Sequence, residues 1–557
     1  MAPNQGTLLS VQNLTIALPR GSDRSFAVED ISFEIFNREI VCIVGESGSG
    51  KSLTANAIMG LLPSLLTPET GKILFKGIDL LRQDEATLRS MRGKDMAMIF
   101  QEPLSALNPV MTSGKQIVEV MSSHDMYSKA ERLRRTLELL EFVDLPDPEN
   151  LYHTYPFELS GGQRQRVMIA MALALEPALL IADEPTTALD VTTQAQILEL
   201  INDIQEEKQM GVMFVTHDFG VVAEIADRII VMEKGHIVEQ GDADQVLNNP
   251  THSYTKKLIA AVPRRRTMVA HAQNQSPVLE VRNLQKTYQL GKRHLFAPQR
   301  KIHAVKDVSF SVHAGETLGI VGESGSGKST IGKCLLRLTS IDDGQIIFKG
   351  QNLTVMSARR LRLLRKEIQM IFQDPYASLN PRHTVGRIIS DGPVANGIGR
   401  RDAQKRTYEL LEMVGLDKSA FKRYPNQFSG GQRQRIGIAR ALALDPKLIV
   451  ADESVSALDV SVQAQVLNLL NDIQKRLNIA LVFITHDLRV AMQVCDAVAV
   501  MQKGAFVEYG KPSQIFDNPQ HPYTQRLISA VPGKDWKPEK SFTAVNQAMD
   551  YTAPANI

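Results

Sequence analysis

The sequence predicts an α/β fold built from two tandem copies of one module, and three observations support this. The segment GESGSGKS occurs at residues 45–52 and again at 322–329. The segment SGGQRQR occurs at 160–166 and again at 429–435. In each half, short apolar runs bounded by polar residues alternate with helical patterns, which is typical of a mostly parallel sheet covered by helices.

The composition is that of a soluble globular chain long enough for several domains. The 557 residues include 43% hydrophobic and 22% charged residues, which excludes disorder as the dominant state. Lys plus Arg total 63 and Asp plus Glu total 61, giving a net charge of +2. This balance argues against a chain built mainly to coat nucleic acid. Cys42, Cys334 and Cys495 lie far apart, so we expect small core residues rather than a metal site.

No stretch reaches the roughly 18 consecutive apolar residues that a membrane-spanning helix needs. The first ten residues, MAPNQGTLLS, contain neither a basic start nor an apolar core of the secretory type. We therefore expect a cytosolic chain, or one that reaches a membrane only through a partner.

The duplication extends beyond the two Gly-rich segments. The pairs Asp183/Glu184 and Asp452/Glu453 are 269 residues apart, as are His217 and His486. The segments PTHSYTKKLIAAVP and PQHPYTQRLISAVP begin at residues 250 and 519, with the same spacing. We predict a first domain at 1–263, a linker at 264–277, a second domain at 278–534 and a tail at 535–557.

Three apolar runs in each half are predicted as buried strands. The first comprises residues 39–46 and 316–323 and ends at the Gly-rich segment. The others are ALLIAD and KLIVAD, then GVMFVTHD and IALVFITHD.

The segment GESGSGKS has the pattern of a phosphate-binding loop. Glycines permit tight turns and close backbone approach, and the N–H groups at the following helix start attract phosphate. Lys51 is expected to contact the β- and γ-phosphates, and the Ser52 hydroxyl to bind Mg²⁺. Lys328 and Ser329 repeat this pair in the second half.

The Asp-Glu pairs close apolar strands, where unpaired buried charge would be costly. Close to phosphates, Asp183 and Asp452 can hold Mg²⁺, while Glu184 and Glu453 polarise an attacking water. The serine of SGGQ is a helix N-cap candidate, and its tandem glycines leave free N–H groups for a second anion site in each half. One nucleotide cannot obviously use both helix starts of the same half, so the second is expected to serve the nucleotide of the other half.

SGGQ between a phosphate loop and an Asp-Glu strand resembles the ATP-binding-cassette (ABC) family. Gln101 in IFQEPLSALNP and Gln373 in IFQDPYASLNP are similar to its Q-loop glutamines. ALD at residues 188–190 and 457–459 resembles its D-loop, and His217 and His486 resemble its switch histidines. The resemblance covers both halves. It implies two P-loop ATPase domains, each a RecA-like α/β core with helical and β subdomains, in a head-to-tail dimer within the chain.

The resemblance also implies roles for individual residues. Catalysis is expected from Glu184, Glu453, His217, His486, Lys51, Lys328, Gln101 and Gln373. Mg²⁺ is expected at Ser52, Gln101 and Asp183, and at Ser329, Gln373 and Asp452. ATP is expected at Gly45, Ser47, Gly48, Gly50, Lys51, Ser52, Leu53, Ser160, Gly161, Gly162, Gln163, Tyr288, Gly322, Ser324, Gly325, Gly327, Lys328, Ser329, Thr330, Ser429, Gly430, Gly431 and Gln432.

The halves differ where the family stacks an aromatic residue on adenine. Tyr288 fits this role in the second half, but the first half has Leu18 at the aligned position. Either Phe26 substitutes there, or Phe26 belongs to the core.

Finer features resemble the dipeptide, oligopeptide and nickel importer group, and most closely its fused peptide- or glutathione-importer subunits. They are the FQ-[DE]-P-x-x-[AS]-LNP segments and the PxHxYTxxL tails. Such a subunit works with two integral-membrane permeases and an extracytoplasmic binding protein, on the cytoplasmic face of the bacterial inner membrane. An alternative is a soluble tandem-cassette ATPase acting on ribosomes or DNA; the short linker disfavours it. An exporter is disfavoured by the importer-type tails.

The permease contact is expected near the Q-loops. The residues considered are Leu104, Ala106, Leu107, Tyr376, Ala377 and Leu379. Either they form a docking surface or they belong to the core of a helical subdomain.

Overall fold

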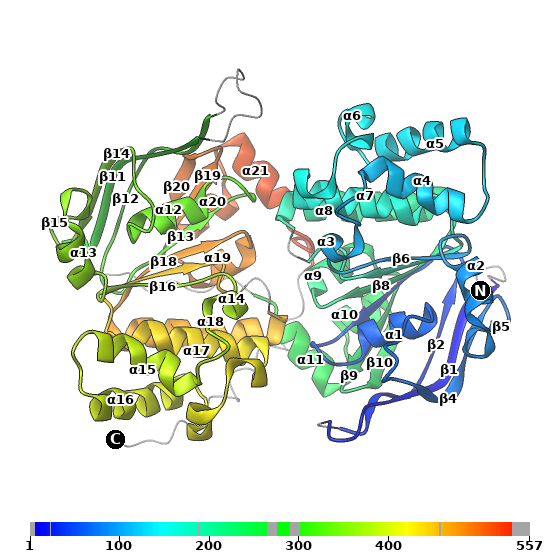
Figure 1. The fold of residues 1–557 in the computed structure, drawn as a ribbon, viewed down its shortest axis with the longest axis horizontal. Helices are drawn as coiled ribbons and strands as arrows, with labels where there is room; N and C mark the ends of the chain where they lie inside the picture. The colour runs from blue at the N-terminus through cyan, green and yellow to red at the C-terminus, as the bar shows by residue number, and fades with distance from the viewer. Residues whose placement is uncertain are drawn as a thin grey trace. The chain divides into compact units, whose positions relative to one another are not determined.

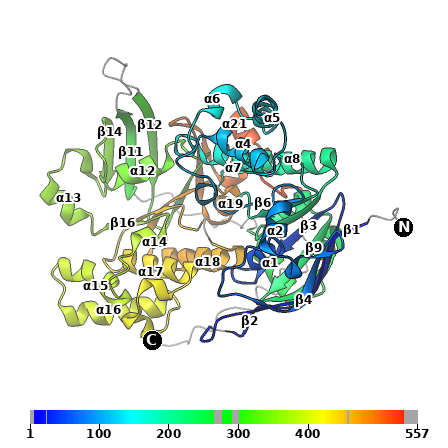
Figure 2. The ribbon, with the colours of Figure 1, turned by 45° about the vertical axis from the view of Figure 1, so that its right-hand side comes forward.

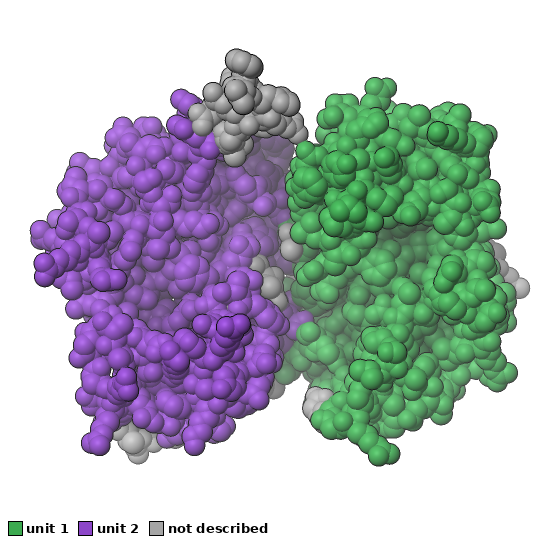
Figure 3. All heavy atoms as spheres, viewed as in Figure 1, with its two compact units in different colours: residues 1–189, 193–262, 532–557 green, residues 190–192, 263–531 purple. Residues whose placement is uncertain are grey.

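The computed structural model describes residues 6–22, 24–187, 189–263, 276–289, 301–455 and 458–536. The chain divides into two compact units (Figure 3). The first comprises residues 1–189, 193–262 and 532–557, and the second comprises 190–192 and 263–531. The predicted linker and tail lie almost wholly outside the described residues. The predicted domain limits stay a prediction.

A six-stranded sheet forms the centre of the first unit, in the order β10-β9-β3-β8-β7-β6. All pairs are parallel except β9 with β10 at one edge. The strands are β3 (Ile40–Val44), β6 (Met96–Ile99), β7 (Leu179–Asp183), β8 (Gly211–Thr216), β9 (Arg228–Glu233) and β10 (His236–Asp242). The three apolar runs predicted as strands in this half are β3, β7 and β8, so the predicted α/β class is confirmed.

The central strand β3 is buried on both faces, which explains its continuous apolar sequence. Val41 and Ile43 pack into a core shared with the N-terminal strands and α1 (Lys51–Ile58). Cys42 and Val44 pack into the other core, formed with the helices on the opposite face. Cys334 and Cys495 are buried in the cores of the second unit, so all three cysteines are core residues, as predicted.

A second, antiparallel sheet begins the first unit, in the order β2-β1-β4-β5. Its strands are β1 (Thr7–Ala17), β2 (Phe26–Phe36), β4 (Pro68–Phe75) and β5 (Ile78–Asp79). Between β6 and β7 the chain forms a helical part, which lies at the opposite end of the unit in Figures 1 and 2. Its helices are α3 (Pro103–Ala106), α4 (Ser113–Ser123), α5 (Lys129–Phe142), α6 (Pro148–Tyr152) and α7 (Gly161–Ala172). The remaining helices are α2 (Glu85–Met91), α8 (Val191–Lys208), α9 (Phe219–Ile225), α10 (Ala243–Asn248) and α11 (Ser253–Ala260).

The second unit repeats this architecture, with a six-stranded sheet in the order β16-β17-β18-β13-β19-β20 and an antiparallel sheet in the order β12-β11-β14-β15. Its strands are β11 (Leu279–Gln289), β12 (Lys301–Val312), β13 (Thr317–Val321), β14 (Asp343–Phe348), β15 (Gln351–Asn352), β16 (Ile368–Ile371), β17 (Leu448–Asp452), β18 (Ala480–Thr485), β19 (Ala497–Gln502) and β20 (Ala505–Gly510). Its helices are α12 (Lys328–Leu335), α13 (Ala358–Leu364), α14 (Pro375–Ser378), α15 (Val385–Ala395), α16 (Arg400–Met413), α17 (Gly430–Leu442), α18 (Val460–Leu477), α19 (Leu488–Val494), α20 (Pro512–Asp517) and α21 (Pro522–Ser529).

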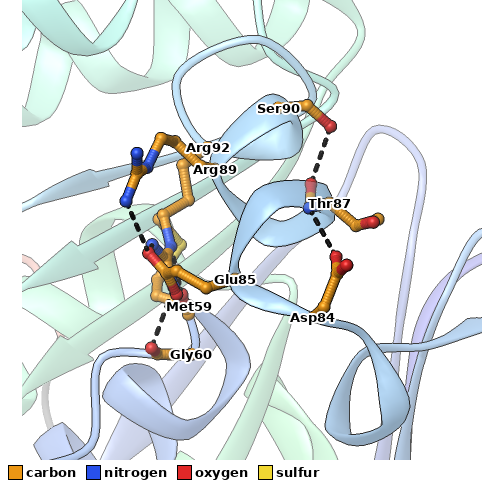
Figure 4. Close-up of polar contacts among 8 residues, drawn as sticks. All are labelled: Met59, Gly60, Asp84, Glu85, Thr87, Arg89, Ser90 and Arg92. Atoms are coloured by element: carbon orange, nitrogen blue, oxygen red, sulfur yellow. Dashed lines mark hydrogen bonds and ion pairs between the residues drawn. The ribbon is translucent and has the colours of Figure 1, made fainter.

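An arginine fixes the end of the helix that follows each Gly-rich loop. Figure 4 shows Arg92, just after α2, reaching the end of α1. Its Nε donates to the Met59 carbonyl at 2.8 Å and its Nη2 to the Gly60 carbonyl at 2.9 Å, while Nη1 pairs with Glu85 at 2.7 Å. Arg365 makes the same type of contact in the second unit, donating to the carbonyls of Leu336 and Arg337. These contacts satisfy carbonyls that a helix end leaves unpaired.

Within the described residues, no helix combines the length and the apolar character needed to cross a membrane.

Candidate functional site

The predicted phosphate loop joins β3 to α1 in the first unit and β13 to α12 in the second. Gly50 and Gly327 precede the helices with φ of +105° and +111°, a conformation that side chains disfavour. A Cβ on Gly45 would lie 2.2 Å from the Met232 carbonyl oxygen, and one on Gly322 would lie 2.2 Å from that of Met501. Glycine is therefore required at these positions by backbone geometry.

The loop lysines are buried and turn back onto their own loops. Lys51 Nζ donates to the carbonyls of Gly45 at 2.8 Å and Glu46 at 2.9 Å. Lys328 Nζ donates to the carbonyls of Gly322 and Glu323, both at 2.7 Å. Burial lowers the pKa of Lys328, although the nearby carboxylates Glu453 and Asp452 oppose the shift.

Each loop serine meets the aspartate at the end of a buried strand. Ser52 Oγ donates to Asp183 Oδ1 at 2.9 Å, and Ser329 Oγ donates to Asp452 Oδ1 at 2.9 Å. Burial raises the pKa of both aspartates, and the adjacent glutamate charge adds to the shift. One hydroxyl and one carboxylate fit Mg²⁺, which takes oxygen ligands and keeps waters or phosphate oxygens as the others. The described residues contain no group of three or more His, Cys, Asp or Glu side chains placed to hold a metal on their own.

Glutamate, glutamine and histidine meet beside each loop. Gln101 Nε2 donates to Glu184 Oε2 at 3.0 Å, and His217 Nδ1 lies 3.2 Å from Glu184 Oε1. In the second unit, Gln373 Nε2 donates to Glu453 Oε2 at 2.6 Å, and His486 Nδ1 lies 3.4 Å from Glu453 Oε1. In both clusters the glutamine contacts Oε2 and the histidine contacts Oε1 of the glutamate.

Both glutamates are held ionised. Burial alone would raise the pKa of Glu184, but the hydrogen bond and charge of His217 lower it to about 2. His486 lowers the pKa of Glu453 for the same reason. Burial opposes protonation of His486, but its hydrogen bond and charge interaction with Glu453 raise its pKa above the usual value. A carboxylate that stays ionised can accept a proton from water or orient it.

Sequence reasoning missed two features of these glutamates. Glu184 and Glu453 have φ of +47° and +43°, an uncommon conformation for a non-glycine residue that is concentrated at functional sites. Thr187 Oγ1 also donates to Glu184 Oε2, at 2.9 Å. The three-residue spacing from Glu184 to Thr187 was the available signal for the second feature.

Each SGGQ segment begins a helix, and its serine is the N-cap as predicted. Ser160 Oγ accepts from Gln163 N at 3.3 Å, while the Gln163 side chain accepts from Ser160 N at 3.0 Å. Ser429 and Gln432 repeat this pair. A Cβ on Gly162 would lie 2.6 Å from Thr193 Cγ2, so this glycine permits packing against α8.

The position proposed to stack on adenine differs between the units. Tyr288 is 37% exposed, and Lys286 Nζ lies 5.4 Å from its ring centroid. Leu18 packs against the core of the first unit. Phe26 pairs with Ala17 across β1 and β2, as His303 pairs with Thr287. Phe26 therefore occupies the position equivalent to His303 rather than to Tyr288.

The residues considered for permease docking divide into two sets. Leu107 and Leu379 are 2% exposed and belong to the cores. Leu104 and Tyr376 are 58% and 64% exposed. Leu107 and Leu379 therefore belong to the cores, and docking by the exposed Leu104 and Tyr376 stays a prediction.

Two family models match parts of this chain. A family model described as ABC transporter matches residues 28–187 and 305–456. A second, described as the C-terminal region of oligopeptide/dipeptide transporters, matches 238–292 and 507–553.

Relatives match along nearly the whole chain. The glutathione import ATP-binding protein GsiA of Salmonella choleraesuis (strain SC-B67) is 49% identical over 560 residues, covering 95% of this chain and 90% of the relative. The protein of the same name from Escherichia coli (strain K12) is 49% identical over 559 residues, with the same coverage. The chain therefore belongs to the ABC transporter family and is an ATPase with two fused cassettes.

Proposed function

We propose that this chain hydrolyses ATP to energise import of a peptide-type solute, with glutathione as the first candidate. The observation that carries the proposal is 49% identity, over 95% of the chain, to proteins named for glutathione import. The matches to the oligopeptide/dipeptide C-terminal region support the same class. These findings favour an importer subunit over the ribosome- or DNA-acting alternative.

The two clusters are suited to ATP hydrolysis. Glu184 and Glu453 orient and polarise the attacking water, and the neighbouring histidines and glutamines hold their carboxylates in place. On nucleotide binding, Lys51 and Lys328 leave their loop carbonyls for the β- and γ-phosphates. Catalysis here is mainly positioning and charge stabilisation.

Ser52, Asp183 and Gln101 would hold Mg²⁺ in the first cassette, and Ser329, Asp452 and Gln373 would hold it in the second. When bound, it neutralises charge on the β- and γ-phosphates. The Ser–Asp contacts of 2.9 Å in both cassettes keep two oxygen donors together beside each loop.

The cassettes work as a head-to-tail pair. Nucleotide on Lys51 faces Ser429, Gly430 and Gly431, while nucleotide on Lys328 faces Ser160, Gly161 and Gly162. The support is chemical, because each cassette has two helix starts suited to anions and its own nucleotide needs only one of them.

The chain is peripheral on the cytoplasmic face of the bacterial inner membrane, bound to two permeases that receive solute from an extracytoplasmic binding protein. Exposed Leu104 and Tyr376 beside the Q-loops form part of the permease contact. Exposed apolar groups of this kind are common at protein interfaces.

Uptake measurements test the proposed substrate class. Cells lacking this chain should take up little radiolabelled glutathione or short peptide through this system, and the natural chain should restore uptake. A chain carrying both Glu184→Gln and Glu453→Gln should not restore it, although it should still co-purify with two integral-membrane proteins. Salt-sensitive association with ribosomes or DNA, without membrane partners, would contradict the proposal.

A further inference from the structure

A buried tyrosine from the C-terminal region of each cassette contacts the phosphate loop. Tyr254 Oη, from α11, accepts the backbone N–H of Glu46 at 3.1 Å. Tyr523 Oη, from α21, accepts the backbone N–H of Glu323 at 3.1 Å. The two tyrosine residues are only 6% and 3% exposed. The same contact therefore occurs twice, between segments about 200 residues apart.

A glutamate on the edge strand anchors the turn before each tyrosine. Glu239 on β10 accepts from Thr251 N at 2.6 Å and His252 N at 3.1 Å. Glu508 on β20 accepts from Gln520 N at 2.9 Å and His521 N at 3.2 Å. Burial opposes ionisation of both carboxyls, but these N–H donors, together with neighbouring threonine hydroxyls, outweigh it and lower the pKa of each. The turn is thus held by charged hydrogen bonds, which are stronger than neutral ones.

The histidine of each PxHxYT segment then begins the helix. His252 Nδ1 accepts the N–H of Tyr254 at 3.2 Å, and His521 Nδ1 accepts that of Tyr523 at 3.1 Å. These bonds satisfy a helix-start N–H and direct the helix from its first turn. The polar residues of the repeated tail segment therefore share one effect, which is to fix the tyrosine against the loop.

The contact lies at the residue that the loop lysine also holds. Glu46 is held through its N–H by Tyr254 and through its carbonyl by Lys51. Glu323 is held in the same way by Tyr523 and Lys328. When the lysine turns to the phosphates, the carbonyl loses this partner, but the tyrosine bond does not depend on the lysine.

We propose that Tyr254 and Tyr523 are positioning residues that keep each phosphate loop in its nucleotide-binding shape. Phosphate is bound by successive loop N–H groups, so their directions depend on the loop backbone. Without the hydroxyl, the Glu46 or Glu323 N–H lacks its acceptor and the start of the loop relaxes. The C-terminal region thereby contributes to nucleotide affinity in each cassette.

Conservative variants of the full-length chain test this proposal one cassette at a time. Tyr254→Phe is combined with Lys328→Ala, and Tyr523→Phe is combined with Lys51→Ala. In each chain, only the cassette whose tyrosine is changed then keeps its loop lysine. Binding of a fluorescent ATP analogue with Mg²⁺ should weaken about tenfold, which is roughly 1.4 kcal/mol. The matched controls are Tyr152→Phe in α6 and Tyr408→Phe in α16, which should bind as their parents do.

Steady-state ATP turnover distinguishes a positioning role of the two tyrosines from a general role in stability. In a chain with both lysines intact, Tyr254→Phe with Tyr523→Phe should raise KM for ATP about tenfold and leave kcat within about twofold. The melting temperature should stay within about 4 °C of that of the Tyr152→Phe and Tyr408→Phe controls, which is the shift expected for one lost hydrogen bond.

Glu239→Gln, which weakens the anchor and leaves the tyrosine in place, should raise KM in the same direction by a smaller factor. It also keeps the test decisive if Tyr254→Phe does not fold. The proposal is overturned if the tyrosine variants bind within twofold of their parents, or if Glu239→Gln leaves KM unchanged. It is equally overturned if kcat and melting temperature fall together with affinity.

Discussion

In both cassettes the loop serine donates to the strand-end aspartate at 2.9 Å, and the loop lysine holds two loop carbonyls at 2.7–2.9 Å. Away from this phosphate end the cassettes differ. Tyr288 is exposed on β11 in the second cassette, whereas the aligned Leu18 packs against the core of the first. Phosphate charge demands specific donors at specific positions, whereas an adenine ring is held by less directional stacking and apolar contact. The comparison indicates that the two copies share the polar contacts of the phosphate end and differ at the position proposed to stack on adenine.

The largest expected effect comes from removing the charge of the two glutamates proposed as catalytic. Glu184→Gln together with Glu453→Gln should lower steady-state ATP turnover at least about 100-fold, because general-base assistance is lost. Each single substitution should also lower turnover, since both clusters are complete. A single variant with unchanged turnover would show that its cassette does not hydrolyse ATP, and the two cassettes would then not be equivalent.

A smaller effect is expected at the position proposed to stack on adenine, which is Tyr288 in the second cassette and Leu18 in the first. Tyr288→Ala should weaken ATP binding to the second cassette about tenfold, because base–aromatic stacking is lost. Binding is measured with Lys51→Ala in the first cassette, and Tyr288→Phe should restore it. Equal binding by Tyr288→Ala and its parent would remove the proposed difference between the cassettes.

A pH-dependent effect is expected at His486. Its pKa is raised in the folded chain, so its pairing with Glu453 stabilises fully below the unfolded-state pKa of about 6.5. This stabilisation is lost as pH rises through the folded-state pKa. The melting temperature of the natural chain should therefore exceed that of His486→Gln by more at pH 6 than at pH 8.5. A difference that grows with pH would contradict the assignment.

The smallest effect concerns residues 532–536, which belong to the first unit. Trp536 packs against the core of that unit, and its Nε1 donates to Asn248 Oδ1 at 3.2 Å. It is the only tryptophan in the chain, so intrinsic fluorescence reports this contact directly. Asn248→Ala should shift the emission to longer wavelength and cost about 1 kcal/mol of stability. Asn249→Ala, at the exposed neighbouring position, should change neither.

Local patterns in the sequence predicted much of the fold and the components of the site. Residues that are neighbours in the sequence define the phosphate loop, the strand-end carboxylates and the N-cap serines. The strands β3 and β7 and the Ser160 N-cap of α7 form as predicted. The left-handed conformation of Glu184 has no sequence signature of its own. The bond from Glu46 to Tyr254 joins residues 208 positions apart. Only the three-dimensional fold brings these two residues together, so motif spacing could not predict their contact.

The central claim is that both cassettes bind and hydrolyse ATP through duplicated clusters. Its most direct test counts the ATP molecules retained by the chain that carries both Glu184→Gln and Glu453→Gln, after incubation with Mg²⁺ and labelled ATP. Because this variant keeps both lysines, serines and aspartates, we predict two unhydrolysed ATP molecules per chain. Retention of one ATP per chain, or release of labelled ADP from one site, would contradict the account.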